Sequence, residues 1–141
     1  MKKTKQIMII ASTLVLIVSC NKKTDDTTPV FKTKTELITT GSWMMSDHIV
    51  DGISDWSMIN ACSKDDFMTF SKNGTVIEDE GAIKCVSGVP QTTTVNWAFT
   101  KDEKKIIVDG NTSNLDLLNE TSIEISFKSG PELFVIKYKK K

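Results

Sequence analysis

The stretch "DFMTFSKNGTVIED", residues 66–79, has two short runs of apolar and β-branched residues on either side of Asn73-Gly74. An Asn-Gly pair between such runs is the strongest short-range signal for a β-hairpin. The sequence therefore predicts paired strands at residues 66–70 and 75–79. Phe70 then faces Val76 or Ile77, depending on whether Gly74 closes a two-residue turn or a bulged three-residue loop.

Further short strands are predicted on both sides of this hairpin, at residues 43–50, 94–100, 106–108, 114–118, 122–127 and 132–139. Alternation places Val95, Trp97 and Phe99 on one face of their strand, and Leu115 and Leu117 on one face of theirs. Short strands joined by tight turns predict an all-β fold, an antiparallel up-and-down barrel of about eight strands. Such a barrel leaves no strand edge exposed.

The first 19 residues have the pattern of a secretory signal peptide, with lysines in "MKKTKQ" and an apolar run from Ile7 to Ser19. That run is shorter than the roughly 20 residues that a membrane-spanning helix needs. Ile17-Val18-Ser19-Cys20 resembles the bacterial lipobox. The resemblance implies that Cys20 becomes the lipidated N-terminus, held in a membrane by acyl chains such as palmitate.

Residues 20–34 are polar, with paired charges and Pro29, and predict a flexible tether before a single domain at residues 35–141. Lys22, Lys23, Asp25 and Asp26 resemble the export signals of Bacteroidota surface lipoproteins. We therefore expect an outer membrane lipoprotein that faces either the periplasm or the cell surface.

A short helix is predicted before the first strand, with Thr35 as its cap and Gly41 at its end. Gly41-Ser42-Trp43, which follows, resembles the G-x-W signature of lipocalins. "ACSKDDFMTFSKNGTV" (61–76), "GAIKC" (81–85) and the strand of Trp97 resemble the lipocalin-like domains of Bacteroidota lipoproteins. The resemblance covers residues 35–141.

This resemblance implies a barrel that can have an interior pocket, with Trp43 as the plug of one end. Lipocalins generally pack an arginine from a late strand over that tryptophan, but this chain has no arginine. Lys137 or Tyr138 could take its place. Since all positive charge is lysine, which lacks the planar fork suited to bases and phosphates, nucleic-acid binding is not expected.

Cys62 and Cys85 remain once Cys20 is lipidated, and an even pair in an exported domain is typical of a disulfide. Cys62 precedes one strand of the hairpin and Cys85 follows the other, so both fall at the same end. The alternative is a metal site or a reactive thiol. The metal ligand set is thin, because His48 is the only histidine.

Catalysis is not expected, since the sequence has no recognised catalytic or phosphate-binding motif. His48 lies in a strand, where alternation puts Asp47 on the opposite face. Asp65 and Asp66 could bind calcium with Glu78 or Asp79, or could hydrogen-bond the turn beside the disulfide. No metal or other cofactor is therefore predicted.

The predicted function is binding of a small, mostly apolar ligand inside the barrel of a monomeric lipoprotein. Val95, Trp97 and Phe99 would line the pocket, with Trp56 near its mouth in a long loop that also carries Met58 and Ile59. That loop could instead pack onto the barrel. The alternative function is a structural or protein-interaction module of the cell envelope, with a barrel filled by its own side chains.

Overall fold

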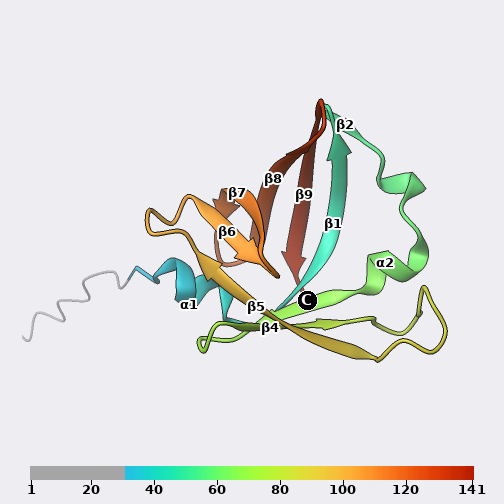
Figure 1. The fold of residues 1–141 in the computed structure, drawn as a ribbon, viewed down its shortest axis with the longest axis horizontal. Coiled ribbons are helices and arrows are strands. Elements are labelled where there is room, and N and C mark those ends of the chain that lie inside the picture. Colours follow the sequence, from blue (N-terminus) through green and yellow to red (C-terminus); the bar gives the residue numbers. More distant parts are fainter. Residues whose placement is uncertain (1–30) are drawn as a thin grey trace, which may run out of the picture. The chain divides into compact units, whose positions relative to one another are not determined.

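The hairpin around Asn73-Gly74 is formed by β3 (Phe67–Phe70) and β4 (Thr75–Asp79) in the computed structural model, which describes residues 31–141 (Figure 1). Phe70 pairs with Val76. The Gly74 amide donates to Ser71, and Gly74 has a φ of 86°, a left-handed conformation that suits glycine. The turn is therefore the bulged three-residue loop.

Seven more strands complete the sheet: β1 (Ser42–Val50), β2 (Ile53–Ser54), β5 (Thr92–Phe99), β6 (Lys105–Val108), β7 (Asn111–Leu118), β8 (Ser122–Ser129) and β9 (Glu132–Lys140). Consecutive strands from β3 to β9 are paired antiparallel, and β1 pairs with both β3 and β9. These pairings close an eight-stranded up-and-down barrel, which confirms the predicted fold class. The two-residue β2 was not predicted and pairs with the end of β1.

The helix α1 (Lys34–Ile38) covers one end of this barrel, here called the closed end, where the turns at 71–74, 100–104 and 119–121 also lie. Its cap is Thr33 and not Thr35, because Thr33 and Glu36 have the spacing of a reciprocal capping box. Ile38 and Trp43 are fully buried, and the Trp43 indole donates to the Ile38 carbonyl over 2.8 Å. The opposite, open end carries the turns at 51–52, 109–110 and 130–131 and the segment 80–91.

Lys140 packs over Trp43, with its Nζ 5.1 Å from the ring centroid. Of the two suggested substitutes for the lipocalin arginine, Lys137 pairs with Glu124, and Tyr138 faces the interior as Trp43 does. Gly41 has a φ of 86°, and a Cβ there would lie 3.3 Å from the Lys140 side chain. The glycine therefore leaves room for the lysine beside the tryptophan.

The core at the closed end is aromatic. Trp97 packs edge-on against Phe70 and Phe99, with ring centroids 5.2 Å apart in both pairs. The predicted sharing of one face by Leu115 and Leu117 is wrong. The pairing of β7 with β8 shifts between these residues, so Leu118 packs against the core and Leu117 is 43% exposed.

The loop between β2 and β3 contains a short 3₁₀ helix η1 (Trp56–Met58) and the helix α2 (Ala61–Asp65), neither of which was predicted. The Cys62–Cys85 disulfide joins α2 to the segment 80–91 and confirms the predicted pairing. Asp65 Oδ2 accepts hydrogen bonds from the Ala82 and Ile83 amides at 2.7 and 2.9 Å. The disulfide and Asp65 thus hold the same two segments together.

The signal peptide, Cys20 and the tether as far as Val30 lie outside the described residues. Within residues 31–141, neither α1 nor α2 has the length and apolar character needed to span a membrane.

Replacing both cysteines (Cys62→Ser/Cys85→Ser) should lower the free energy of unfolding by about 3 kcal/mol, because the unfolded chain regains the entropy of an open loop. Urea denaturation of the variant measures the loss, and the reduced wild-type protein is the matched control. A loss below about 1 kcal/mol in both would contradict this account of the bridge.

Candidate functional site

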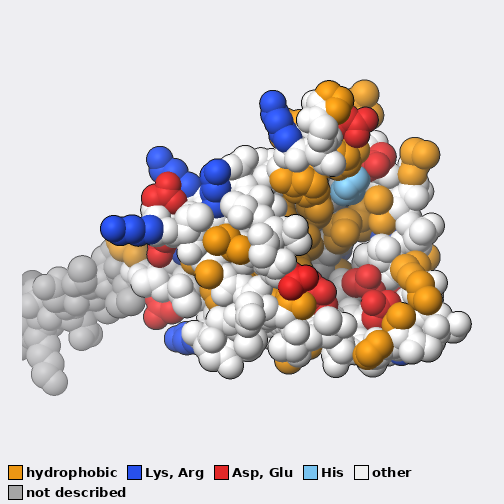
Figure 2. Space-filling view, in the orientation of Figure 1, with side chains coloured by type: hydrophobic (Ala, Val, Ile, Leu, Met, Phe, Trp, Pro, Cys, Tyr) orange, Lys and Arg blue, Asp and Glu red, His pale blue; other side chains and the backbone are white. Residues whose placement is uncertain are grey.

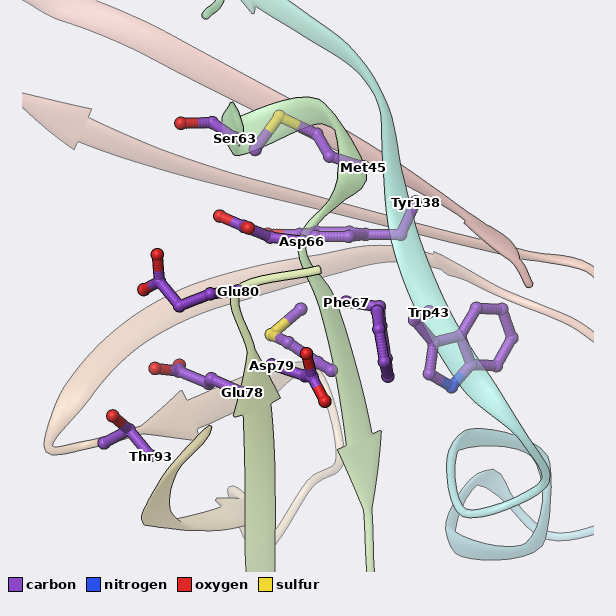
Figure 3. A pocket seen from close by; sticks show the side chains of 11 residues that line it. Trp43, Met45, Ser63, Asp66, Phe67, Glu78, Asp79, Glu80, Thr93 and Tyr138 are labelled. Carbon is purple, nitrogen blue, oxygen red and sulfur yellow. The ribbon is translucent and has the colours of Figure 1, made fainter. Parts of the chain in front are cut away.

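Two neighbouring cavities of about 300 Å³ each lie in the barrel and share Met68, Glu78 and Tyr138. The first, here called the acidic cavity, is shown in Figure 3; it is lined by Trp43, Met45, Ser63, Asp66, Phe67, Met68, Glu78, Asp79, Glu80, Thr93 and Tyr138. The second, the apolar cavity, is lined by Met68, Phe70, Glu78, Ile106, Val108, Asp109, Asn111, Ser113, Ile123, Ile125 and Tyr138. Each volume is at the lower end of the range of small-molecule sites.

Strand alternation places the two polar side chains that both cavities share. Val76 is fully buried in the core, so Glu78, two residues further along β4, also faces the interior, while Ile77 between them is 40% exposed. Glu78 pairs with Met68 on β3 and with Thr93 on β5. Tyr138 on β9 pairs with Met45 on β1 and Ile123 on β8. A carboxylate and a phenol are thus set among apolar side chains.

The acidic cavity gathers carboxyl groups from the ends of β3 and β4. In Figure 3, Glu78 and Glu80 extend toward the side on which the Asp66 carboxyl lies. Burial raises the pKa of Asp66 to about 6, and the charges of Glu80, Asp65, Asp79 and Glu78 add to the shift. Asp66 Oδ1 is buried without a hydrogen-bond partner among the described residues.

The pKa values of Glu78 and Tyr138 are also raised by their surroundings. Burial, followed by the charges of Asp109 and Glu80, raises the pKa of Glu78. Burial, followed by the charge of Glu78, raises the pKa of Tyr138 to about 12. No lysine is among the residues that line either cavity. The negative charge is therefore uncompensated locally, which favours a cationic group in the cavity.

Val95, Trp97 and Phe99, the predicted pocket residues, face the interior but are not among the residues that line the two cavities. They pack in the core, and the Trp97 indole donates to the Ser71 carbonyl over 3.0 Å. A role for them in ligand contact stays a prediction. The sequence did contain a signal for Glu78, because a strand that turns Val76 inward must also turn Glu78 inward.

Trp56, the predicted mouth residue, is half-buried in η1, with Lys64 Nζ 4.8 Å from its ring centroid. It does not line either cavity, and its part in binding also stays a prediction. Met58 beside it is 81% exposed. Trp43, by contrast, lies at the boundary between the closed-end core and the acidic cavity.

His48 has a carboxylate partner that sequence reasoning missed. Its Nδ1 lies 2.6 Å from Asp55 Oδ1, and both side chains are partly buried. Asp55 comes next to β1 because the chain turns at 51–52 and returns through β2, and its amide donates to the His48 carbonyl. The pair ties the loop that carries η1 to β1.

Asp65 hydrogen-bonds the backbone beside the disulfide. Its hydrogen bonds to the segment 80–91 agree with the structural alternative, in which it bonds the turn beside the disulfide. In the part of the chain from residue 31 onward, no group of three or more His, Cys, Asp or Glu side chains is arranged to hold a metal ion.

Two solved structures are similar to this chain in fold. A lipocalin-like protein from Bacteroides uniformis aligns with a TM-score of 0.47 and 16% identity over 73% of this chain and 98% of that one. A DUF4847 family protein from Bacteroides vulgatus aligns with a TM-score of 0.47 and 10% identity over 74% of this chain and 94% of that one. No protein-family model matches the chain, and no curated protein matches its sequence.

The raised pKa of Asp66 should appear in the pH dependence of stability. A folded-state pKa of about 6, above the ordinary 3.8, means that the folded protein favours the protonated carboxyl. The stabilisation is therefore complete below about pH 4 and is lost as the pH rises through about 6. Asp66→Asn should remove this fall, as measured by urea denaturation between pH 4 and pH 7.

Asp102→Asn is the matched control, because hydrogen bonds from Thr100 and Lys104 lower the pKa of Asp102. Asp102 therefore titrates below the tested range, and Asp102→Asn should leave the fall in stability between pH 4 and pH 7 unchanged. Parallel pH curves for the wild type and Asp66→Asn would show that Asp66 titrates normally.

Proposed function

We propose that this chain is a lipid-anchored extracytoplasmic protein whose barrel binds a small molecule with an apolar body and one cationic group. The observation that carries the proposal is the pair of neighbouring cavities that share Glu78 and Tyr138 and are lined by carboxylates without a lysine. An eight-stranded barrel has room for one small ligand or for its own side chains alone. Here the aromatic core fills only the closed end.

The apolar body of the ligand would lie against Met68, Phe70, Ile106, Ile123 and Ile125 in the apolar cavity. Burial of this surface contributes roughly 25 cal/mol per Å². Figure 2 shows acidic side chains at the edge of a hollow with an apolar wall, which is the arrangement that such an amphipathic ligand requires. The sequence predicted a mostly apolar ligand, and the acidic cavity adds that this ligand should carry a positive charge.

The cationic group would sit at Glu78 and Asp66. Both carboxyls have raised pKa values because they are desolvated and lie near other acids. A bound cation favours their ionised forms, so binding releases protons and strengthens as the pH rises through about 6. The affinity for a neutral ligand of the same size should not increase with this rise in pH.

The anchor is proposed at Cys20, on the lipobox resemblance of residues 17–20. The Cys62–Cys85 disulfide supports an oxidising compartment outside the cytoplasm. The proposed role is binding without catalysis, in the periplasm or at the cell surface.

A second candidate function is contact with another envelope protein. Ile53, Met58, Ile83 and Val86 are exposed large apolar residues in the segments at the open end. Single exposed apolar residues are common, but several around one opening are typical of a contact surface. This role does not exclude a ligand inside the barrel.

The ligand class can be tested with n-octylamine, 1-octanol and octanoate, which share a chain and differ in charge. The protein is the oxidised, non-lipidated mature chain, residues 20–141 with Cys20→Ser. Calorimetry at pH 7.5 should show the amine bound at least about ten-fold more tightly than the alcohol, since a hydrogen bond to a charged group is worth about 1.5–3 kcal/mol. Glu78→Gln should reduce this preference.

Glu132→Gln is the control, because Glu132 is exposed at the start of β9 and does not line either cavity. Equal affinity for amine and alcohol would leave an apolar carrier without charge selectivity. Failure of all three probes with the folded protein would reject a small-ligand site of this size and favour the protein-contact role.

A further inference from the structure

Lysine side chains are concentrated at the closed end of the barrel. Figure 2 shows them near the end where α1 lies in Figure 1. They come from the residues before and in α1 (Lys32, Lys34), the β3–β4 turn (Lys72), the β5–β6 turn and the start of β6 (Lys101, Lys104, Lys105) and the C-terminus (Lys139, Lys140, Lys141). All except Lys34 and Lys140 are exposed.

Three of the acids at the closed end are already engaged by their neighbours, while a fourth, Glu103, lies in the β5–β6 turn. Glu36 accepts hydrogen bonds from Thr33 in the capping box, Asp102 accepts one from Thr100, and Glu120 lies 2.6 Å from Lys32. These contacts lower the pKa of each carboxyl, so all three are ionised at neutral pH. They reduce the positive charge of this end, but the lysines outnumber all acids there.

The open end has the opposite charge. Asp51, Asp66, Asp79, Glu80 and Asp109 lie there, while its lysines are Lys64, Lys84 and Lys128. The charge of the domain is therefore separated along the barrel axis. Near an anionic surface, such a separation turns the closed end toward that surface and the open end away from it.

The closed end also has a surface groove of about 400 Å³. Its lining includes Lys72, Lys101 and one acid, Glu103, together with the edges of the core residues Trp97 and Phe99. Phe31, which precedes α1, is 86% exposed beside Lys32. Lysines next to aromatic side chains are the combination found where proteins contact lipid headgroups, because the ring meets the apolar part and the ammonium meets the phosphate.

Chain connectivity brings the same end toward a membrane. The described domain begins with Phe31, next to α1 at the closed end, and Cys20 lies eleven residues earlier in the chain. Eleven residues span at most roughly 40 Å. An acyl group on Cys20 would thus hold the lysines of the closed end at high local concentration next to the bilayer.

We propose that the closed end docks on an anionic phospholipid surface through Lys72, Lys101 and their neighbours, so that the open end and its acidic cavity face the aqueous compartment. The docking rests on the anchoring part of the proposed function and is independent of ligand binding. It gives a cationic ligand access to the barrel from solution and not from the bilayer.

The test couples Cys20 of the oxidised mature chain to a maleimide lipid in vesicles of phosphatidylcholine, with or without phosphatidylglycerol. Lysine acetylation is then followed residue by residue by mass spectrometry at low salt. Lys72, Lys101 and Lys104 should react at least about three-fold more slowly on the vesicles with phosphatidylglycerol. Lys84 and Lys128 at the open end are the internal controls and should react equally on both.

A double variant makes the test sharper. Lys72→Gln/Lys101→Gln should abolish the protection of Lys104, since each lysine near such a surface contributes about a factor of five in affinity. Lys84→Gln/Lys128→Gln removes the same charge and should leave the protection intact. Protection of Lys84 and Lys128 instead, or of no lysine, would overturn the docking. Octylamine binding is measured without vesicles, so its result tests the ligand proposal independently of the docking.

Discussion

The pairing of β1 with β9 is the constraint on which the rest of the structure depends. It joins the first and last long strands of the domain and turns an open sheet into a barrel with an inside and an outside. Once the barrel is closed, alternation fixes the face of each strand residue except at the register shifts in β1 and β7. Trp43 and Tyr138, on the two strands that close the barrel, must then both face the interior.

One end of the barrel is filled by side chains, and the other is hollow. At the closed end, α1 brings Ile38 onto Trp43, and the aromatic residues of β3 and β5 fill the remaining width. The pairing of β1 with β3 extends only from Ser42 to Met44, so the two strands are not paired at the open end. α2 and the disulfide-linked segment 80–91 lie at this end, and the loop acid Asp66 joins Glu78 in the acidic cavity.

The sequence allowed the strands, their order and the disulfide to be predicted, because these follow from local periodicity and from turns that join neighbours. It did not predict the shifted pairing next to Asp116, which exposes Leu117, or the packing of Lys140 on Trp43. Both features depend on the register between two strands, that is, on which residue of one strand lies opposite a given residue of the other. Asp66, Glu78 and Asp79 were grouped from the sequence as possible calcium ligands, because a hairpin brings its two strands together, but the cavity that they line was not predicted, since it forms only when the barrel closes.

Carboxyl groups gathered in a partly desolvated cavity are unfavourable for folding, as the raised pKa values of Asp66 and Glu78 indicate. Apolar residues at these positions would remove the repulsion, so the arrangement has no explanation in stability alone. Violations of the folding pattern of this kind are expected at functional sites. The lysines at the closed end have no such cost, because they are solvated. The two groups of charges therefore differ in their energetics. The desolvated acids inside the barrel destabilise the fold and suit a cationic ligand, whereas the solvated lysines outside suit contact with an anionic surface.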